Sequence, residues 1–302
     1  MQNISFYLED SKRIGVSLLV HFGGWLPDKL YLKAIFPEYM GYKLNLTNPK
    51  TFAEKLQWLK LYDRKPIYHQ MVDKVEAKKY IDGIVGPGYT IPTLGVYESF
   101  EQIDWKALPQ QFILKATHDS GSYYIVKDKH QVNKELCKKK LYVNWNKDFY
   151  KTSREWQYKG VKSRIIAEPL LVDERCPYLR DFKFYCFNGE PKIFYITSDK
   201  GGSLPTRQDF FDIQGNHLDL EDVHYTKNPV KAPELPEHLG EMVSIARKLA
   251  KGTYHIRVDF YEVNGKVYVG ELTLQENAGF CKFTPDEWNM TLGSWIRLPI
   301  DK

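Results

Sequence analysis

The sequence predicts an α+β protein in two lobes rather than one doubly wound sheet, and two observations support this class. Helical periodicity fills the first part of the chain, whereas strand hairpins separated by single helices fill the rest. Asn-Gly pairs at 188–189 and 264–265 mark two hairpin turns. With 302 residues, the chain can bury a large core and divide into two or more lobes.

The predicted helices and strands follow from local signals. Thr51 and Glu54 form a capping box for a helix that ends near Asp63, because Pro66 cannot continue it. Residues 1–46 read as helical and irregular, with Pro27 and Pro37 as breaks. Further helices are expected at 67–81, 131–150, 237–250 and 284–298. Strands are expected at 90–96, 111–116, 123–126, 164–171, 181–187, 191–198, 209–213, 255–263 and 266–274.

Composition and charge exclude some classes of partner. Hydrophobic residues make up 43% of the chain and charged residues 27%, as in an ordinary soluble globular protein. The net charge of +5 suits small anionic substrates, but the clustered basic stripe of a nucleic-acid binder is missing. We therefore expect no nucleic-acid partner.

Cysteine use and hydropathy favour a cytoplasmic location. The four cysteines contain no CxxC pair and no metal-ligand spacing, which is typical of reduced thiols. The apolar segment 14–26 is too short to span a bilayer, and no small-residue cleavage site follows it. We expect no transmembrane segment and no signal peptide, whereas a peripheral membrane contact by this segment stays open.

Charged residues interrupt the hairpin around Asn264-Gly265, and the register decides whether they meet. A two-residue turn would place Asp259 opposite Gly270 and turn Glu271 to the other face. A three-residue turn, with Gly265 as a left-handed bulge, would instead pair Arg257 with Glu271 and set Asp259 diagonally on the same face. We predict the second register, which gathers the makings of a magnesium–phosphate site. An exposed cross-strand ion pair is the structural alternative.

A second candidate region follows the predicted strand 111–116. Lys115 stands at the end of this strand, directly before the small polar run 117–122. A tip rich in small residues and backbone N–H groups can fold over phosphates, although most such tips are simple turns. The region is a candidate phosphate contact.

Four sequence blocks together resemble the ATP-grasp superfamily, and most closely its TupA-like branch, which is associated with bacterial surface-polysaccharide gene clusters. The blocks are NPKTFAEKLQWLKLYDR (48–64), FILKATHDSG (112–121), RDFKFYCFNGEPK (180–192) and RVDFY…GELT (257–273). The resemblance covers roughly residues 44–298. It implies the ATP-grasp fold, in which two α+β lobes clamp the nucleotide, here with a helical N-terminal extension.

The resemblance also implies domain boundaries. Residues 1–46 would be the helical extension and 47–110 a substrate or pre-grasp region. Residues 111–170 would form the small ATP-grasp lobe with its phosphate flap, and 171–302 the large lobe with the metal-binding hairpin.

The resemblance implies a set of nucleotide contacts. Lys115 would touch the α- and β-phosphates of ATP, with Lys74 as a second cation. The flap over the triphosphate would consist of His118, Asp119, Ser120, Gly121 and Ser122. Glu168, Leu170 and Leu171 would form the hinge that meets adenine, Asp173 or Glu174 would meet the ribose, and Asp181 would lie beside the nucleotide.

The resemblance implies metal and catalytic residues as well. Asp259 and Glu271 would hold Mg²⁺, because hard carboxylate oxygens are its preferred protein ligands. Arg257 would steady the transferred phosphoryl group, and Lys183 would face the γ-phosphate or the acceptor carboxylate. Many ATP-grasp ligases have Asn two residues after the metal-binding glutamate, where this chain has Thr273. Gln275 or Asn277 could substitute as an oxygen ligand, so the number of metal ions, one or two, stays open.

The activity implied is that of an ATP-dependent, ADP-forming carboxylate–amine ligase acting through an acyl phosphate. The substrates would be ATP, a glycan or sugar-nucleotide carboxylate such as a uronic acid, and an amine or amino acid. A phosphotransferase that uses the same clamp is the first alternative. A glycosyltransferase is a second, although no DxD pair stands at a strand end. A nucleotide-binding module without catalysis is a third.

Overall fold

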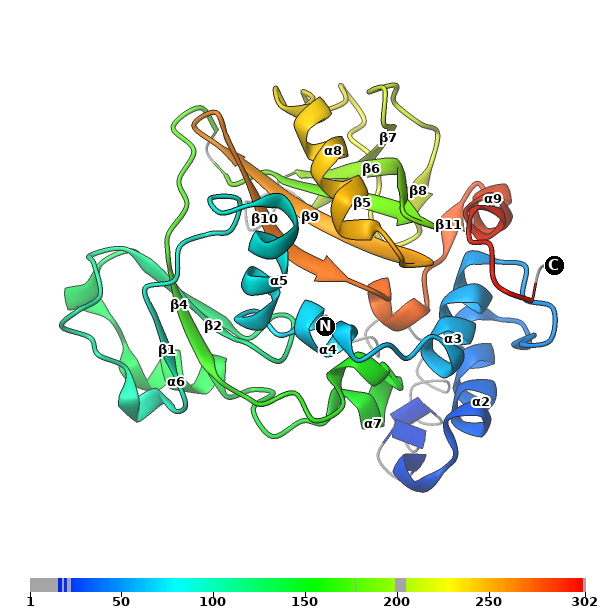
Figure 1. Ribbon diagram of the computed structural model, residues 1–302, viewed down its shortest axis with the longest axis horizontal. Coiled ribbons are helices and arrows are strands. Elements are labelled where there is room, and N and C mark those ends of the chain that lie inside the picture. The colour runs from blue at the N-terminus through cyan, green and yellow to red at the C-terminus, as the bar shows by residue number, and fades with distance from the viewer. Residues whose placement is uncertain (1–15, 18, 21–22, 177, 199–204, 301–302) are drawn as a thin grey trace.

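The computed structural model describes residues 16–17, 19–20, 23–176, 178–198 and 205–300. This part of the chain has an α+β architecture with two main antiparallel sheets and a third sheet of two short strands (Figure 1). The predicted fold class is therefore confirmed. Most of the predicted helical region before residue 23 lies outside the described residues, and so does part of the segment 14–26 that was considered for membrane contact. Within the described part of the chain, no helix combines the length and apolar character needed to cross a bilayer.

The smaller sheet has the strand order β1-β4-β2-β3. Its strands are β1 (Gly95–Tyr97), β4 (Ile165–Pro169), β2 (Phe112–Ala116) and β3 (Tyr123–Val126). One face buries Phe112, Leu114 and Ala167 with Cys137 and Leu141 of α6 (Lys134–Leu141). Since successive residues of a strand point to opposite faces, Lys115 and Glu168 lie on the face away from this core.

The larger sheet has the order β10-β9-β5-β6-β7. Its strands are β10 (Lys266–Thr273), β9 (His255–Val263), β5 (Asp181–Phe187), β6 (Glu190–Ser198) and β7 (Arg207–Asp212). Phe184, Val258 and Phe260 pack with α8 (Leu239–Ala250) on one face. The opposite face is divided. Tyr185 and Phe187 join the core of the helical region, whereas Lys183, Arg257 and Asp259 form a charged half.

The helical region packs on that divided face. It comprises α2 (Asp28–Met40), α3 (Phe52–Tyr62) and α9 (Glu287–Trp295), whose buried residues share one core with Tyr185 and Phe187. The predicted capping box is confirmed, because the Thr51 side chain accepts from Glu54 N at 3.2 Å and Glu54 accepts from Thr51 N at 3.1 Å. The remaining elements are α7 (Phe149–Ser153), η2 (Gly23–Trp25), η3 (Phe100–Gln102), η4 (Lys129–Gln131), η5 (Trp156–Tyr158), η6 (Glu276–Gly279), β8 (Glu221–Asp222) and β11 (Phe283–Thr284).

Four element predictions are wrong in detail. The helix expected at 67–81 is broken into α4 (Ile67–Val72) and α5 (Glu76–Val85), because Asp73 is extended and its carboxylate accepts from Val75 N and Glu76 N. The helix expected at 131–150 is reduced to α6 and α7. Of the strand expected at 90–96, only its last two residues belong to β1, and Pro37 lies inside α2 rather than breaking it.

The register of the central hairpin corrects the predicted three-residue turn. Val263 pairs with Lys266 across a two-residue turn in which both Asn264 and Gly265 have positive φ. The register then shifts between Val269 and Glu271, so that Glu271 pairs directly with Asp259. The bulge therefore restores the parity that a plain two-residue turn would lose, and the two carboxylates share one face.

Candidate active site

A buried cluster of charges occupies the polar half of the larger sheet. Arg257 binds Asp259 through two hydrogen bonds, Nε to Oδ1 at 2.6 Å and Nη2 to Oδ2 at 2.7 Å. Lys183 on β5 also donates to Asp259 Oδ2 from the neighbouring strand. Burial opposes ionisation of Asp259, but the charges of Arg257 and Lys183 outweigh it and hold the pKa of that carboxyl below its ordinary value. Asp259 is thus an anion inside the protein.

The other predicted residues of this face lie around the cluster. Glu271 stands opposite Asp259, with Oε2 4.0 Å from Arg257 Nη2, and about a third of its side chain is exposed. Thr273 Oγ1 accepts from Arg257 Nη2 at 3.1 Å. Asp181, two residues before Lys183 on β5, is buried on the same face. The structure therefore brings these residues together.

Glu276 belongs to this cluster and was not predicted from the sequence. Its Oε1 accepts from Arg257 Nη1 at 2.5 Å and from the Tyr195 hydroxyl at 2.7 Å. Its Oε2 is buried and has no hydrogen-bond partner, and burial raises the pKa of Glu276 to about 8. Of its two neighbours considered as alternative ligands, Gln275 accepts from Gln157 at 2.7 Å, and Asn277 has a positive φ of 47°.

The carboxyl groups of this cluster are of the kind that binds a divalent cation, although in the described residues their three oxygens do not converge within 4.8 Å of one another. Three carboxyl groups, those of Asp259, Glu271 and Glu276, surround one guanidinium and one ammonium group. The Glu276 Oε2 atom is buried without a hydrogen-bond partner, and the Glu271 carboxylate is accessible. Hard oxygen ligands of this kind suit Mg²⁺.

A second cluster lies on the polar face of the smaller sheet. The Glu168 carboxylate binds Lys115 Nζ at 2.7 Å and Lys78 Nζ at 2.5 Å. Burial opposes ionisation of Glu168, yet the two ammonium groups lower its pKa overall. Glu168 was predicted as a hinge contact for adenine, but here it holds two lysines side by side. Lys78 was missed; its spacing of four residues from Lys74, within the helix predicted at 67–81, was the available signal.

The segment predicted as a flap is anchored at its base. The Asn144 side chain donates to Asp119 Oδ2 at 2.8 Å, the Ser122 hydroxyl donates to the same oxygen, and His118 Nε2 donates to the Asn144 carbonyl at 3.1 Å. These three side chains of the segment are buried, whereas Ser120 and Gly121 at the tip are exposed. Lys74 Nζ donates to the Asp119 carbonyl, so Lys74 contacts this segment rather than Lys115.

The predicted hinge loop is hydrogen-bonded to the turn of the β9–β10 hairpin. Glu174 N donates to Asn264 Oδ1 at 3.2 Å, and Asp173 Oδ1 accepts from Arg175 N at 3.1 Å. Leu170 and Leu171 are partly exposed at the end of β4. The loop therefore leads from the smaller sheet to the turn between β9 and β10.

Tyr158 feels charges from both the carboxylate cluster and the anchored loop. Burial raises its pKa well above the ordinary value, and the negative charges of Glu155, Glu271 and Asp119 add to the effect. Glu271 belongs to the larger sheet and Asp119 follows a strand of the smaller one. Charges of the carboxylate cluster and of the anchored loop therefore both act on the Tyr158 hydroxyl.

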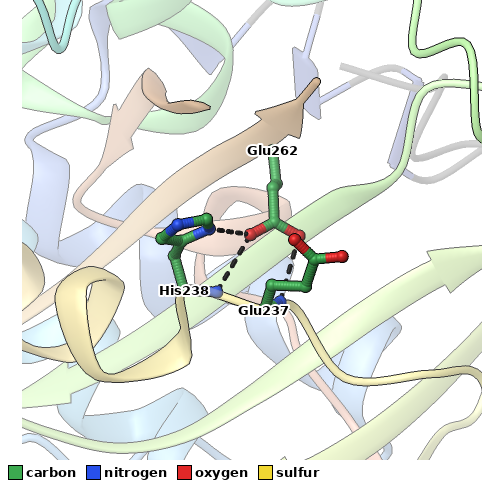
Figure 2. A group of neighbouring side chains, drawn as sticks. All are labelled: Glu237, His238 and Glu262. Carbon is green, nitrogen blue, oxygen red and sulfur yellow. Dashed lines mark hydrogen bonds and ion pairs between the residues drawn. The ribbon is translucent and has the colours of Figure 1, made fainter. Parts of the chain in front are cut away.

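Another group with metal-ligand chemistry has a structural role. Glu237, His238 and Glu262 bring ligand atoms within 4.8 Å of one another, the one such group found in the described residues (Figure 2). Glu262 Oε1 accepts from His238 N at 2.9 Å and His238 Nδ1 at 2.7 Å, and its Oε2 accepts from Glu237 N at 3.1 Å. The Glu262 carboxylate therefore caps the N-terminus of α8.

The sequence matches the family model described as TupA-like ATPgrasp over residues 54–297. The chain belongs to the TupA-like ATP-grasp family. Its expected fold is thereby confirmed, and the family is part of the ATP-grasp superfamily of ATP-dependent ligases. A search of curated proteins found no match.

Solved structures similar to this ATP-grasp protein include three ligases or synthetases. D-alanine–D-alanine ligase from Bacillus anthracis, complexed with ATP, has 19% identity and a TM-score of 0.39, with 68% of this chain and 55% of that one covered. The Helicobacter pylori D-alanine–D-alanine ligase has 15% identity and a TM-score of 0.43, with 83% of this chain and 70% of that one covered. N5-carboxyaminoimidazole ribonucleotide synthetase from Thermus thermophilus has 12% identity and a TM-score of 0.39, with 69% of this chain and 46% of that one covered. The chain thus spans about half the length of the B. anthracis enzyme.

Proposed function

We propose that this TupA-like protein is an ADP-forming carboxylate–amine ligase that works through an acyl phosphate in bacterial surface-polysaccharide biosynthesis. The observation that carries the proposal is the pairing of Asp259 with Glu271 beside Arg257, Lys183 and the unpartnered oxygen of Glu276. Family membership supports the use of ATP.

The cationic cluster of the smaller sheet supports binding of the ATP phosphates. Lys115 and Lys78 are held together by Glu168, so both ammonium groups are oriented before a ligand arrives. Such orientation reduces the entropy lost on binding. In this proposal Lys115 and Lys78 neutralise the α- and β-phosphates. Lys74 holds the loop of His118, Asp119, Ser120, Gly121 and Ser122, whose exposed tip closes over the triphosphate.

Asp259 and Glu271 would hold Mg²⁺, with Glu276 as a further oxygen donor in place of the Asn found in many ATP-grasp ligases. When bound, Mg²⁺ neutralises charge on phosphate oxygens during transfer. Thr273, which accepts a hydrogen bond from Arg257, would then orient the guanidinium rather than bind the ion directly. Asp181 would add to the negative field of the same face.

The proposed reaction has two steps. A carboxylate oxygen of the acceptor attacks the γ-phosphorus, the bond from that phosphorus to the bridging oxygen breaks, and ADP leaves with the electron pair. Arg257 and Lys183 are placed to stabilise negative charge on the transferred group. An amine nitrogen then attacks the acyl carbon, inorganic phosphate leaves, and the nitrogen loses a proton to give the amide.

The substrate class follows from the family's association rather than from a side chain. The carboxylate is proposed to be a uronic acid of a glycan or sugar-nucleotide precursor, or else an amino acid that is joined to a sugar amine. The hinge residues Glu168, Leu170 and Leu171 and the loop residues Asp173 and Glu174 border the proposed adenosine site. We propose a cytoplasmic reaction, because ATP and sugar nucleotides are available there.

ADP release tests this proposal. Purified protein with ATP and Mg²⁺ should release ADP only when both a carboxylate and an amine are present, and mass spectrometry should detect their amide. Neutral hydroxylamine should trap the acyl phosphate as a hydroxamate when the amine is left out. A phosphorylated product that survives hydroxylamine would instead identify a phosphotransferase. The absence of ADP release across uronates and amino acids would count against ligation.

A further inference from the structure

A cavity between the start of α3 and α9 has a strongly cationic lining. It has a volume of about 540 Å³ and is lined by Asn48, Lys50, Lys55, Met290, Ser294, Arg297 and Ile300. These residues come from the segment before α3, from α3 itself and from α9 with the segment after it. α3 and α9 lie at the opposite end of the molecule from the smaller sheet (Figure 1). The cavity is therefore separate from the cluster that contains Lys115 and Glu168.

The walls of this cavity are held together by close backbone packing. A Cβ atom added at Gly293 would lie 2.1 Å from the Lys50 carbonyl oxygen and 2.8 Å from Phe52 N. α9 can therefore approach the start of α3 only because position 293 has no side chain. The buried Lys55 Nζ also donates to the Ile296 carbonyl at 2.6 Å. These contacts give the site a defined shape before any ligand binds.

The charge of the lining indicates the kind of ligand. Three of the seven lining residues, Lys50, Lys55 and Arg297, are cationic, and none is acidic. Like charges gathered in a concave site raise the local concentration of anions, and lysine and arginine side chains form strong hydrogen bonds to phosphate and carboxylate oxygens. The lining therefore favours an anion over a neutral or cationic ligand.

Size and the remaining lining residues narrow the class further. A volume of about 540 Å³ falls in the range of sites for small organic ligands, roughly 300–1,000 Å³. Asn48 and Ser294 offer polar groups for hydroxyls, while the half-exposed Met290 and Ile300 offer apolar contact. We propose that this cavity is a binding site for an anionic saccharide that carries a carboxylate or a phosphate group. The proposal is independent of the ligase function.

Calorimetric titration tests the site in 150 mM salt, with glucuronate, glucose 1-phosphate and glucose as probes. At least one of the two anionic sugars should bind the wild-type protein, whereas neutral glucose should not. The double variant K50A/R297A should weaken binding at least tenfold, because both positions are exposed and take no part in the core. Comparison of the two anions tells whether the site prefers a carboxylate or a phosphate.

Two controls separate this cavity from other cationic surfaces. The matched double variant K139A/K248A, at exposed positions of α6 and α8, should leave affinity unchanged. K115A should also retain binding, because Lys115 lies in the other cluster. If K50A/R297A lowers the melting temperature, the titration is repeated with the double variant K50Q/R297Q. The proposal would be overturned if neither anion bound the wild-type protein, or if the cavity variants kept their affinity. It would also be overturned if K139A/K248A lost as much affinity as the cavity variants, or if K115A lost affinity.

Discussion

Asp259 and Glu271 face each other directly across β9 and β10, although a regular hairpin with the observed two-residue turn would place Glu271 on the opposite face. The register shift at Gly270 produces this pairing. It gives the charged face two carboxylates on adjacent strands, which Arg257 can reach together. One extra residue in β10 therefore determines whether the two carboxylates share a face, as the proposed cation site requires.

Glu271 is expected to be necessary for activity but not for stability. Glu271→Gln keeps the shape of the side chain and removes an anionic ligand, while the partly exposed side chain makes only a 4.0 Å contact with Arg257. We expect ADP release to fall by about two orders of magnitude or more, in line with the loss of a group that holds charge in the transition state. The melting temperature should change little. Glu234→Gln, at an exposed position, is the matched control and should keep full activity. Full activity in Glu271→Gln would show that the Glu271 carboxylate takes no part in the reaction.

Gly270→Ala should destabilise the protein and disturb the hairpin register. A Cβ atom at this position would lie 2.5 Å from the Tyr261 ring, which has to move to admit it. Overpacking of this kind costs about 1–3 kcal/mol of the free energy of unfolding, measurable by urea denaturation. Gly240→Ala is the matched control, since no atom lies within 4 Å of its added Cβ and the position is helical. That variant should be stabilised by about 0.5–1 kcal/mol, and equal effects of the two substitutions would refute the steric argument.

The ion pairs of Glu168 should make stability depend on acid pH. The two lysines keep the pKa of folded Glu168 below its ordinary value, so the folded state binds fewer protons than the unfolded state as this carboxyl titrates. Its stabilising contribution is therefore complete above the unfolded pKa and is lost as pH falls through the folded pKa. Melting temperatures between pH 7 and pH 3 should fall less steeply for Glu168→Gln than for the wild type. Parallel curves would show that Glu168 contributes nothing to this dependence.

Lys60 is expected to stabilise the loop that carries Glu276. Its buried ammonium donates to Ser153 O at 2.8 Å and to Ala278 O, and burial lowers the pKa of Lys60 to about 8. Lys60→Met would leave these carbonyl oxygens without their donor, which costs about 1–3 kcal/mol per buried group. We expect a lower free energy of unfolding and a higher KM for Mg²⁺-dependent ADP release. The exposed Lys139→Met is the control, and an unchanged stability in Lys60→Met would contradict the proposed role.

Local signals predicted much of the secondary structure. The capping box of Thr51 and Glu54 located the start of α3, and the limits of β5 and β9 agree with the predicted strands. These features depend on residues only a few positions apart. Asp73 shows the limit of such signals, because its carboxylate ends one helix and caps the next where apolar periodicity alone predicted a continuous helix.

The chain's own order of residues determined that this protein has hairpins carrying charged residues, an α+β composition and the motifs of an ATP-grasp family. Only the tertiary structure decided which charges meet. Glu276 reaches Arg257 from a loop with positive φ angles, and Lys78 reaches Glu168 from a helix 90 positions earlier. Sequence periodicity reports which face of an element a residue occupies, whereas contacts between elements depend on register, bulges and packing across the whole chain.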